Sequence, residues 1–217
     1  MCSRIFAAWY SAAMNVTEPT LIRPLRTVLL ASARGDLLIV GLGPGHDLRH
    51  IPPGVTSITA IDPNPAMREV AQRRAERLDV AVDIIDSFAE LLPFPDDSFD
   101  TVLVSVVLCS VRDVSASLTH IKRVLRPGGE LLVLEHVRAA DNTVYGKFQD
   151  LVAGPWSALT DGCRPNRRTR DALIDAGFDT DMLGTGVLPV PGPISTFLIG
   201  RATVAADQVR MIRPTGT

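Results

Sequence analysis

Three glycines near the start of the chain are the first residues whose type and spacing suggest a chemical role. The apolar segment "LLIV", residues 37–40, leads directly into Gly41, Gly43 and Gly45. Glycine lets a chain turn sharply off a strand and lets backbone N–H groups approach a ligand. The pattern is weak by itself. His46 stands where a dinucleotide fingerprint has its third glycine, and no Gly-Lys-Ser/Thr phosphate loop is present.

An acidic residue strengthens the case for a ligand site at the glycines. Asp62 ends the next apolar run, "SITAI", about twenty residues after the first glycine. A carboxylate at this place can accept hydrogen bonds from both hydroxyls of a ribose. The alternative is that Asp62 caps a helix beginning with Pro63. Because the glycines and the acid occur together, we favour ribose binding.

Further polar residues follow the later apolar runs. His136 comes after the run 130–134 and is a candidate base or substrate contact. The alternative is a histidine bonded to a neighbouring backbone carbonyl. Asp161, Cys163 and Arg164 belong to "DGCR", which provides either a contact from a capping segment or a simple turn. Asp161 is therefore the second candidate catalytic residue. Cys109 fits a small buried residue better than a nucleophile.

Two aromatic residues and a group of arginines complete the candidate substrate site. Tyr10 is a candidate lid residue, with a helix packed on the domain as the equal alternative, and Trp156 precedes "DGCR". Arg164 and the arginines of residues 167–170 could attract an anionic substrate. The alternative is that they form a solvated loop and helix start. The solvated loop is the more common case.

The elements that must position these residues alternate along the chain. Apolar runs rich in Val, Ile and Leu have the composition of strands buried on both faces of a parallel sheet. Helical stretches separate them, and two last strands flank the turn "PGPI". This alternation predicts a doubly wound α/β sheet. The expected strands cover residues 37–40, 57–61, 81–85, 101–104, 130–134, 180–190 and 195–203. The expected helical stretches are 65–78, 169–178 and 115–129, the last with Pro127-Gly128-Gly129 as its stop signal.

Domain boundaries follow from the places where this alternation is absent. We expect an N-terminal helical cap over residues 1–34, one domain over 35–203 and a flexible tail over 204–217. The cap and the segment 138–168 are both expected to cover the carboxyl ends of the strands, where ligands bind in open α/β sheets.

Composition limits the class of protein. The 217 residues are 46% hydrophobic and 21% charged, which suits a folded domain, and the net charge of −2 gives no reason to expect nucleic acid as a partner. Three widely spaced cysteines predict a reduced, cytoplasmic protein without a metal motif of the Cys-x-x-Cys kind. The first twenty residues hold no apolar run long enough for a signal peptide or a membrane span.

In their order, the segments "LIVGLGPG", "AIDPNPAM", "DSFAELLPFPDDSFDTVLVSVVLCSV" and "IKRVLRPGGELLVLEHV" resemble class I S-adenosylmethionine-dependent methyltransferases. The resemblance implies a Rossmann-like sheet of seven strands, the last one antiparallel, with helices on both faces and an N-terminal helical lid. It implies S-adenosyl-L-methionine as cofactor and S-adenosyl-L-homocysteine as product. The ligand over the glycines then carries no phosphate.

The resemblance also assigns the residues of the cofactor site. The three glycines match the loop under the methionyl group, and Asp62 matches the ribose acid. The remaining matches are Pro63 and Met67 near the adenine, Ser87, Phe88 and Ala89 at its edge, and Ser105 and Leu108 near the methionyl amino group. Ile39 and Phe88 depart from the family, which often has an acid at the first position and Asp or Ser at the second. An aromatic ring at Phe88 can pack on the adenine face and leaves the adenine edge to backbone groups.

Shorter sequence matches indicate which molecule accepts the methyl group. "RVLRPGG", "LEHV" and "GPWSALTDGCRPNRRT" resemble a methyltransferase group related to thiol S-methyltransferases, often labelled phosphatidylethanolamine methyltransferase-like. Eukaryotic members carry an N-terminal membrane anchor that we do not expect here, so a small soluble thiol is favoured. We expect a monomer or homodimer. O- or N-methylation of a small metabolite, a cofactor-binding relative that transfers no methyl group, and a nicotinamide oxidoreductase remain as alternatives, in that order.

Overall fold

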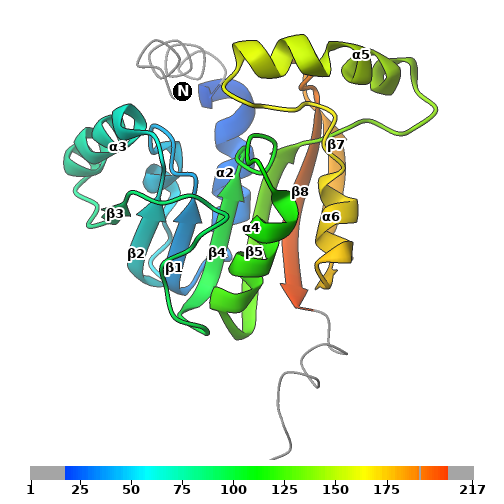
Figure 1. Cartoon of the computed structure of the whole chain (residues 1–217). Helices are drawn as coiled ribbons and strands as arrows, with labels where there is room; N and C mark the ends of the chain where they lie inside the picture. Colours follow the sequence, from blue (N-terminus) through cyan, green and yellow to red (C-terminus); the bar gives the residue numbers. More distant parts are fainter. Residues whose placement is uncertain (1–17, 191, 205–217) are drawn as a thin grey trace, which may run out of the picture.

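A computed structural model describes residues 18–190 and 192–204 as one mixed sheet with helices around it (Figure 1). The strands are β1 (Gly35–Val40), β2 (Val55–Ile61), β3 (Asp83–Ile85), β4 (Phe99–Ser105), β5 (Leu125–His136), β6 (Phe178–Asp179), β7 (Leu183–Val187) and β8 (Thr196–Val204). The helical elements are η1 (Glu18–Ile22), α2 (Arg23–Leu30), η2 (His46–His50), α3 (Pro65–Leu78), α4 (Val114–Val124), α5 (Val144–Leu159) and α6 (Thr169–Asp175).

The sheet order is β3-β2-β1-β4-β5-β8-β6, with β7 also paired to β8. Strands β1 to β5 pair in parallel, whereas β8 runs antiparallel to β5, β6 and β7. The predicted doubly wound arrangement with an antiparallel last strand is therefore confirmed.

The number of strands differs from the predicted seven because the outer edge is divided. β6 pairs with the end of β8, where Phe178 faces Val204, and β7 pairs with its first half, where Leu183 faces Gly200. Between them the Asp181 N–H donates to the Asp179 carboxylate at 2.9 Å, which forms a local turn. Eight strands thus occupy seven positions in the sheet.

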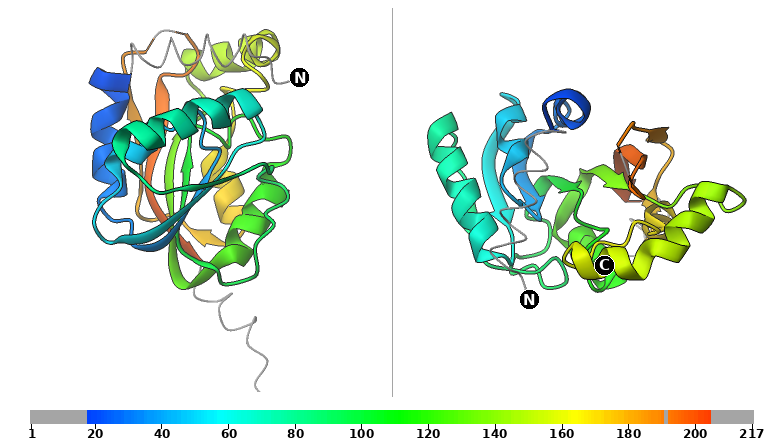
Figure 2. Two further views of the ribbon diagram at one scale, coloured as in Figure 1. Left: turned by 90° about the vertical axis from the view of Figure 1, so that its left-hand side faces the viewer. Right: turned by 90° about the horizontal axis from the view of Figure 1, so that it is seen from above.

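The central strands are buried on both faces, as their composition predicts. Leu37, Leu38, Ile39 and Val40 of β1 are all 0% exposed. Alternate residues of the strands belong to two separate hydrophobic clusters, one with α4 and α6 and the other with α2 and α3. Figure 2 shows these helices on opposite faces of the sheet.

Helix boundaries agree with the sequence pattern for α3, which spans the predicted residues 65–78, and differ at two C-terminal ends. α4 ends at Val124, just before the expected stop signal Pro127-Gly128-Gly129, and α6 ends at Asp175 instead of residue 178. Leu125 is already extended and begins β5, which pairs with Phe99 of β4 and shifts its register before Glu130. Strand pairing therefore begins two residues before the stop signal.

The described part of the expected N-terminal cap packs along one face of the sheet. Leu29 and Leu30 of α2 are buried in the same cluster as Leu132 and Leu134 of β5. Tyr10 and the rest of residues 1–17 lie outside the described residues. The lid over the carboxyl ends thus stays a prediction.

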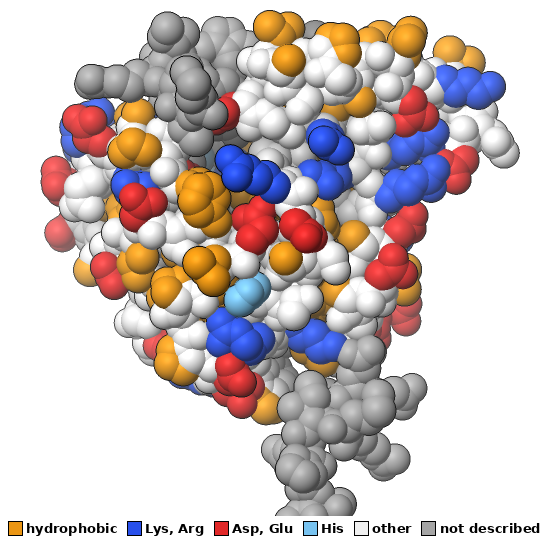
Figure 3. Space-filling model, viewed as in Figure 1, with side chains coloured by type: hydrophobic (Ala, Val, Ile, Leu, Met, Phe, Trp, Pro, Cys, Tyr) orange, Lys and Arg blue, Asp and Glu red, His pale blue; other side chains and the backbone are white. Residues whose placement is uncertain are grey.

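α5 lies across the carboxyl ends of the parallel strands, above the sheet in Figure 1. Its outer side exposes Val144, Leu151 and Leu159, and hydrophobic side chains accordingly appear along the top of Figure 3. Attachment to the domain depends on the inner side, where Gly146 and Gln149 are buried.

Gln149 is the main polar link between α5 and the rest of the domain. It is 0% exposed, and its Oε1 accepts the Ala139 N–H at 2.8 Å. Its Nε2 lies 3.1 Å from the carbonyl oxygens of Val137 and Pro165 and 2.8 Å from that of Pro193. One side chain thus joins α5 to the end of β5, the segment after α5 and the loop before β8.

We expect Gln149→Ala to lower the free energy of unfolding by about 1–3 kcal/mol, because it leaves buried backbone groups without partners. Denaturant unfolding of the purified protein measures this loss. Lys147→Ala, at an exposed position of the same helix, is the control and should change stability by less than about 0.5 kcal/mol. Equal stability of the two variants would contradict the role given to Gln149.

Candidate functional site

The glycine loop follows β1 at the carboxyl end of the sheet and needs glycine for its conformation. Gly41, Gly43 and Gly45 have φ angles of 71°, 55° and 76°, in the region that favours glycine. A Cβ at Gly41 would lie 2.2 Å from the Val107 side chain, whereas one at Gly43 would meet nothing within 4 Å. The loop therefore packs on the segment after β4 and is open at Gly43, where a ligand can approach.

Asp62 lies beside this loop at the end of β2 and is 6% exposed. One carboxylate oxygen accepts the Gly43 N–H at 2.7 Å and the other accepts the Asn64 N–H at 2.8 Å. Burial raises the pKa of Asp62, while these two N–H groups act in the opposite direction. Each carboxylate oxygen still has a second acceptor position for a hydroxyl.

The alternative role of Asp62 as a helix cap is wrong. Asn64 caps α3, since its side-chain oxygen accepts from the N–H groups of Ala66 at 3.0 Å and Met67 at 3.4 Å. Met67 is buried in the first turn of α3, and Pro63 is partly buried before it. Asp62 therefore does not cap α3, and its carboxylate is bonded to the glycine loop and to the Asn64 N–H.

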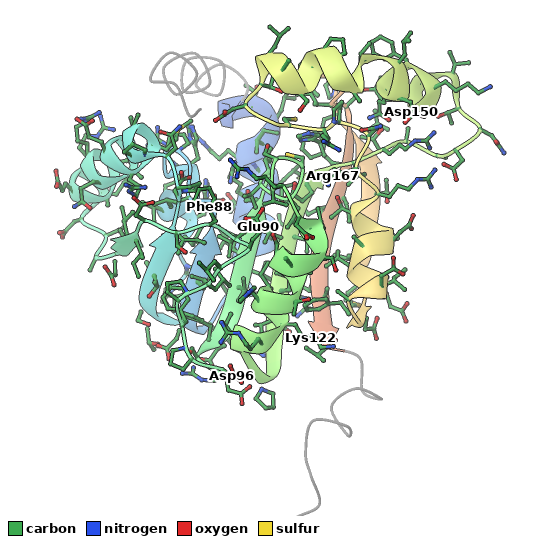
Figure 4. The ribbon with its side chains drawn as sticks, viewed as in Figure 1. Phe88, Glu90, Asp96, Lys122, Asp150 and Arg167 are labelled. Carbon is green, nitrogen blue, oxygen red and sulfur yellow. The ribbon has the colours of Figure 1, made fainter. Side chains whose placement is uncertain are left out.

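The turn after β3 brings Ser87, Phe88 and Ala89 to the same end of the sheet. Ser87 and Ala89 are buried, and the Ser87 hydroxyl donates to the Leu91 carbonyl at 2.7 Å. Phe88 is 50% exposed, and the Arg112 guanidinium lies 5.9 Å from the centre of its ring. Figure 4 shows Phe88 next to Glu90, between α3 and α4. The departure at Phe88 thus places an accessible aromatic ring on this edge.

The segment after β4 is bound to a buried carboxyl group that sequence reasoning missed. Glu135 is 0% exposed, and its Oε1 accepts the N–H groups of Val107 at 2.8 Å and Leu108 at 2.9 Å. Burial raises the pKa of Glu135 to about 7, although these N–H groups lower it. Val106, immediately before, has a φ of 57°, which is rare for a β-branched residue and common at functional sites. Only the position of Glu135 inside an otherwise apolar strand marks it in the sequence.

A second buried network connects α2 with this region. The Arg26 guanidinium contacts the Asp47 carboxylate and donates to the Ser105 hydroxyl at 2.5 Å. All three side chains are buried, and Asp47 stands two residues after the glycine loop. Ser105, predicted near the cofactor, is thus fixed by a residue of α2. Sequence reasoning missed Arg26 because nothing in its local pattern separates it from a surface arginine.

The structure brings three residues named as candidates from the sequence, His136, Trp156 and Cys163, together with Cys109. His136 Nε2 lies 3.1 Å from Cys163 Sγ, and Trp156 Nε1–H donates to the same sulfur at 3.3 Å. The ligand atoms of Cys109, His136 and Cys163 all lie within 4.8 Å of one another, and all three residues are buried. The expected alternative for His136, a bond to a backbone carbonyl, is replaced by this sulfur contact.

The cluster favours a thiolate on Cys163. Hydrogen bonding from the Cys109 thiol, followed by that from His136 and Trp156, lowers the pKa of Cys163 to about 4 in spite of burial. The same bond and burial raise the pKa of Cys109. The contact with Cys163 raises the pKa of His136 against the effect of its burial. Cys109 is buried, as expected from the sequence, and its sulfur belongs to this cluster.

Asp161 and Arg164 do not join this cluster through their side chains. Asp161 and Gly162 have φ angles of 54° and 94°, so they form a turn after α5. The Arg164 side chain is exposed, and its backbone N–H donates to the Cys109 carbonyl at 2.8 Å. The turn thereby places Cys163 against the end of β4, and the functional roles of Asp161 and Arg164 stay predictions.

The described residues contain no helix with the length and apolar character required to cross a membrane.

Comparison with known proteins identifies the family. A methyltransferase-domain family model matches residues 38–133. The human thiol S-methyltransferase TMT1A is 32% identical over 178 residues, covering 80% of this chain and 72% of that protein. A ubiquinone/menaquinone biosynthesis C-methyltransferase of Methylobacterium nodulans is 31% identical over 172 residues, covering 77% of this chain and 66% of that one.

A solved structure shows the same fold. It is a SAM-dependent methyltransferase of Thermotoga maritima, described as a possible histamine N-methyltransferase, with a TM-score of 0.68 and 23% identity over 93% of this chain and 97% of that one. The chain belongs to the class I S-adenosylmethionine-dependent methyltransferases and is related to the thiol S-methyltransferases. Its cofactor is S-adenosylmethionine, and it is a methyltransferase. The residues at the carboxyl ends of β1 and β2 fit this group, because Gly43 is open to a ligand and Asp62 keeps acceptor positions beside it.

We expect Asp62→Ala to weaken S-adenosylmethionine binding on the order of tenfold to a hundredfold, since one charge-assisted hydrogen bond contributes roughly 1.5–3 kcal/mol. Calorimetric titration of the folded variant measures the change. Asp86→Ala, an exposed acid after β3, is the matched control and should bind normally. Unchanged affinity of Asp62→Ala would remove this residue from the cofactor site.

His46 provides a second test, on stability. The residue is 4% exposed, and neither ring nitrogen has a hydrogen-bond partner among the described residues. Burial, together with the nearby Arg74 and Arg26, lowers the pKa of His46 to about 3. Below the ordinary histidine pKa the unfolded chain takes up a proton that the folded chain does not. The free energy of unfolding therefore decreases as the pH is lowered from about 6.5 to 3.

We expect His46→Gln to lack the part of the pH dependence of stability that comes from His46. Between pH 7 and pH 5 the wild type should lose about 1–2 kcal/mol more stability than the variant. Denaturant unfolding at several pH values measures the difference, and His120→Gln in α4 is the matched control, expected to follow the wild type. Parallel pH profiles for wild type and His46→Gln would show that the imidazole is protonated in the folded protein.

Proposed function

We propose that this methyltransferase transfers the methyl group of S-adenosylmethionine to the sulfur of a small thiol. One observation carries the proposal: His136 Nε2 is engaged with Cys163 Sγ at 3.1 Å instead of being available as a base. A thiol has an ordinary pKa of about 8.5, so it ionises without strong base assistance, whereas a hydroxyl does not. The 32% identity to a human thiol S-methyltransferase supports the same acceptor.

In the proposed arrangement, the cofactor lies across the carboxyl ends of β1, β2 and β4. The methionyl part packs over Gly41, Gly43 and Gly45, and the ribose hydroxyls bind Asp62. The adenine lies between Met67 and the turn containing Phe88, which contributes a ring face while backbone groups read the adenine edge. Ser105 and Leu108 hold the methionyl end.

The acceptor approaches from the side of α5 and the turn after it. The segment after β4 packs on the glycine loop through Val107, and two residues later Cys109 belongs to the cluster with His136 and Cys163. A thiolate held there lies on the methyl side of the cofactor. Transfer is an in-line displacement, so the main task of the protein is to align the acceptor sulfur with the methyl carbon and the cofactor sulfur. Trp156 supplies an aromatic wall, and Asp161 and Arg164 flank the entrance.

A carbon acceptor is the second candidate, because the chain is 31% identical to a C-methyltransferase of ubiquinone and menaquinone biosynthesis. An acceptor carbon of this kind needs deprotonation by the protein or by its own ring hydroxyl. The described site offers only Oε2 of the fully buried Glu135 for this purpose, because Oε1 accepts the N–H groups of Val107 and Leu108. We therefore rank it below the thiol.

An acceptor panel tests the proposal. The purified protein is incubated with S-adenosylmethionine and matched thiols, alcohols, amines and phenols, and mass spectrometry measures S-adenosylhomocysteine and the methylated product together. We expect thioethers as the main products. Alcohols of the same shape should react slower by about 10²–10⁴-fold, which is the usual effect of lacking a general base.

Asp62→Ala is the control for cofactor-dependent transfer and should reduce thioether formation at limiting cofactor. Faster methylation of an oxygen, nitrogen or carbon acceptor than of any thiol would contradict the proposal. Tight cofactor binding without any methylated product would favour a relative that transfers no methyl group.

A further inference from the structure

The cluster of Cys109, His136 and Cys163 has the composition of a metal site. Two sulfur atoms and one imidazole nitrogen lie within 4.8 Å of one another, and all three side chains are buried. They come from three separate segments: the turn after β4, the last residue of β5 and the turn after α5. No local motif in the sequence connects them, so only the fold assembles the set.

The spacing suits a tetrahedral ion. Zinc binds sulfur at about 2.3 Å and imidazole nitrogen at about 2.0–2.1 Å, so two ligand atoms on one ion lie roughly 3–4 Å apart. His136 Nε2 and Cys163 Sγ are 3.1 Å apart, and the third atom lies within 4.8 Å of both. The three ligand atoms are thus close enough together to share one ion.

The ligands are also held from outside. Trp156 Nε1–H donates to Cys163 Sγ at 3.3 Å, and the Arg164 N–H donates to the Cys109 carbonyl at 2.8 Å, which fixes the two cysteine segments against each other. His136 is paired with Phe197 across β5 and β8. Such outer contacts orient the ligands of metal sites and strengthen metal binding.

One Zn²⁺ would offset the charges of two cysteine thiolates, with the imidazole neutral. Glu135 precedes His136 in β5, and its Oε2 has no hydrogen-bond partner among the described residues. The Arg167 side chain donates to the Val111 carbonyl, two residues after Cys109. Figure 4 shows Arg167 above the carboxyl ends of the strands, on the side of α5.

We propose that Cys109, His136 and Cys163 bind one Zn²⁺, and that its fourth position takes the sulfur of the acceptor thiol. Three protein ligands with one open position are the arrangement of catalytic zinc, whereas structural zinc has four. The site adjoins the cofactor loop, since Val107 packs on Gly41 two residues before Cys109. The second part of this inference rests on the proposed thiol acceptor.

The zinc changes how the thiol loses its proton. On coordination the acceptor releases its proton to solvent and binds as a thiolate. A sulfur electron pair then forms a bond to the methyl carbon, and the bond between this carbon and the cofactor sulfur breaks, with its electrons staying on S-adenosylhomocysteine. The neutral thioether is a weak ligand and leaves. The sum is thiol plus S-adenosylmethionine giving thioether, S-adenosylhomocysteine and one proton, with no oxidant.

Metal binding is tested first and without activity. The full chain, purified with a phosphine reductant, should contain about one equivalent of zinc by plasma mass spectrometry. After chelation, added Co²⁺ should give the visible bands of a tetrahedral site and a thiolate-to-cobalt charge-transfer band. Cys109→Ser, Cys163→Ser and His136→Asn should each weaken zinc binding by at least about a hundredfold, beyond the effect of outer-contact mutations. His120→Asn is the matched control and should bind zinc normally.

Loss of folding in a variant is separated from loss of a ligand by a measurement on the unmodified protein. In low denaturant, where brief opening of the fold makes buried sulfurs accessible, bound Zn²⁺ should slow alkylation of Cys109 and Cys163, and chelation should speed it, as peptide mass spectrometry detects. Equal alkylation with and without zinc overturns the metal site. So does a Cys109–Cys163 disulfide in protein purified under reducing conditions, or a cobalt spectrum without the charge-transfer band.

The open position is tested with 2-mercaptoethanol as the probe. Its addition to the cobalt protein should shift the visible bands and increase the charge-transfer absorption, and 2-methoxyethanol should not. An unchanged spectrum overturns the acceptor part. Thiol methylation at full rate by the zinc-free protein overturns this inference but leaves the proposed function intact. Zinc binding with a thiol-sensitive spectrum but no thiol methylation contradicts the proposed function while the metal site stands.

Discussion

The carboxyl group of Glu135 holds the turn on which both halves of the site depend. Its two bonds to the N–H groups of Val107 and Leu108 attach the chain after β4 to the end of β5. The turn begins with Val106 at a φ of 57°, a conformation that a β-branched residue keeps only when its surroundings enforce it. The buried carboxyl group supplies part of that enforcement.

From this turn the packing extends in two directions. Val107 fills the space beside Gly41, where any side chain would collide with it, and so sets the position of the glycine loop. Cys109 reaches the opposite side and meets Cys163 and His136. The glycine loop and the sulfur cluster are thus positioned by neighbouring residues of one segment.

In each of these two regions, one buried polar side chain connects neighbouring segments by hydrogen bonds. At the glycine loop, Asp62 accepts the Gly43 N–H and joins the ends of β1 and β2. Near the sulfur cluster, Gln149 connects α5 to the end of β5 and to the segment after Cys163. The first link belongs to the part of the fold shared with other methyltransferases. The second belongs to the segment between β5 and α6, which interrupts the regular alternation of strands and helices.

The sequence by itself determined the sheet, the glycine loop and the acidic residue after β2. These depend on local signals: buried strands are read from continuous Val, Ile and Leu runs, and loop glycines from their fixed spacing after a strand. It did not reveal that Asn64, two residues after Asp62, caps α3, because both residue types favour that position. It did not reveal β6 either, because Phe178 was assigned to the end of the preceding helix and the next strand was expected to begin at Thr180.

Only the tertiary structure decided the surroundings of His136 and the partners of the buried charges. Cys109, His136 and Cys163 are separated by 27 residues at each step, and their meeting depends on the pairing of β4 with β5 and on the return of the chain after α5. Arg26 and Glu135 resemble ordinary charged residues in a linear sequence. Their burial follows from contacts with Asp47, Ser105 and the turn after β4, which form only when distant segments pack together, since a buried charge requires partners that no local pattern specifies.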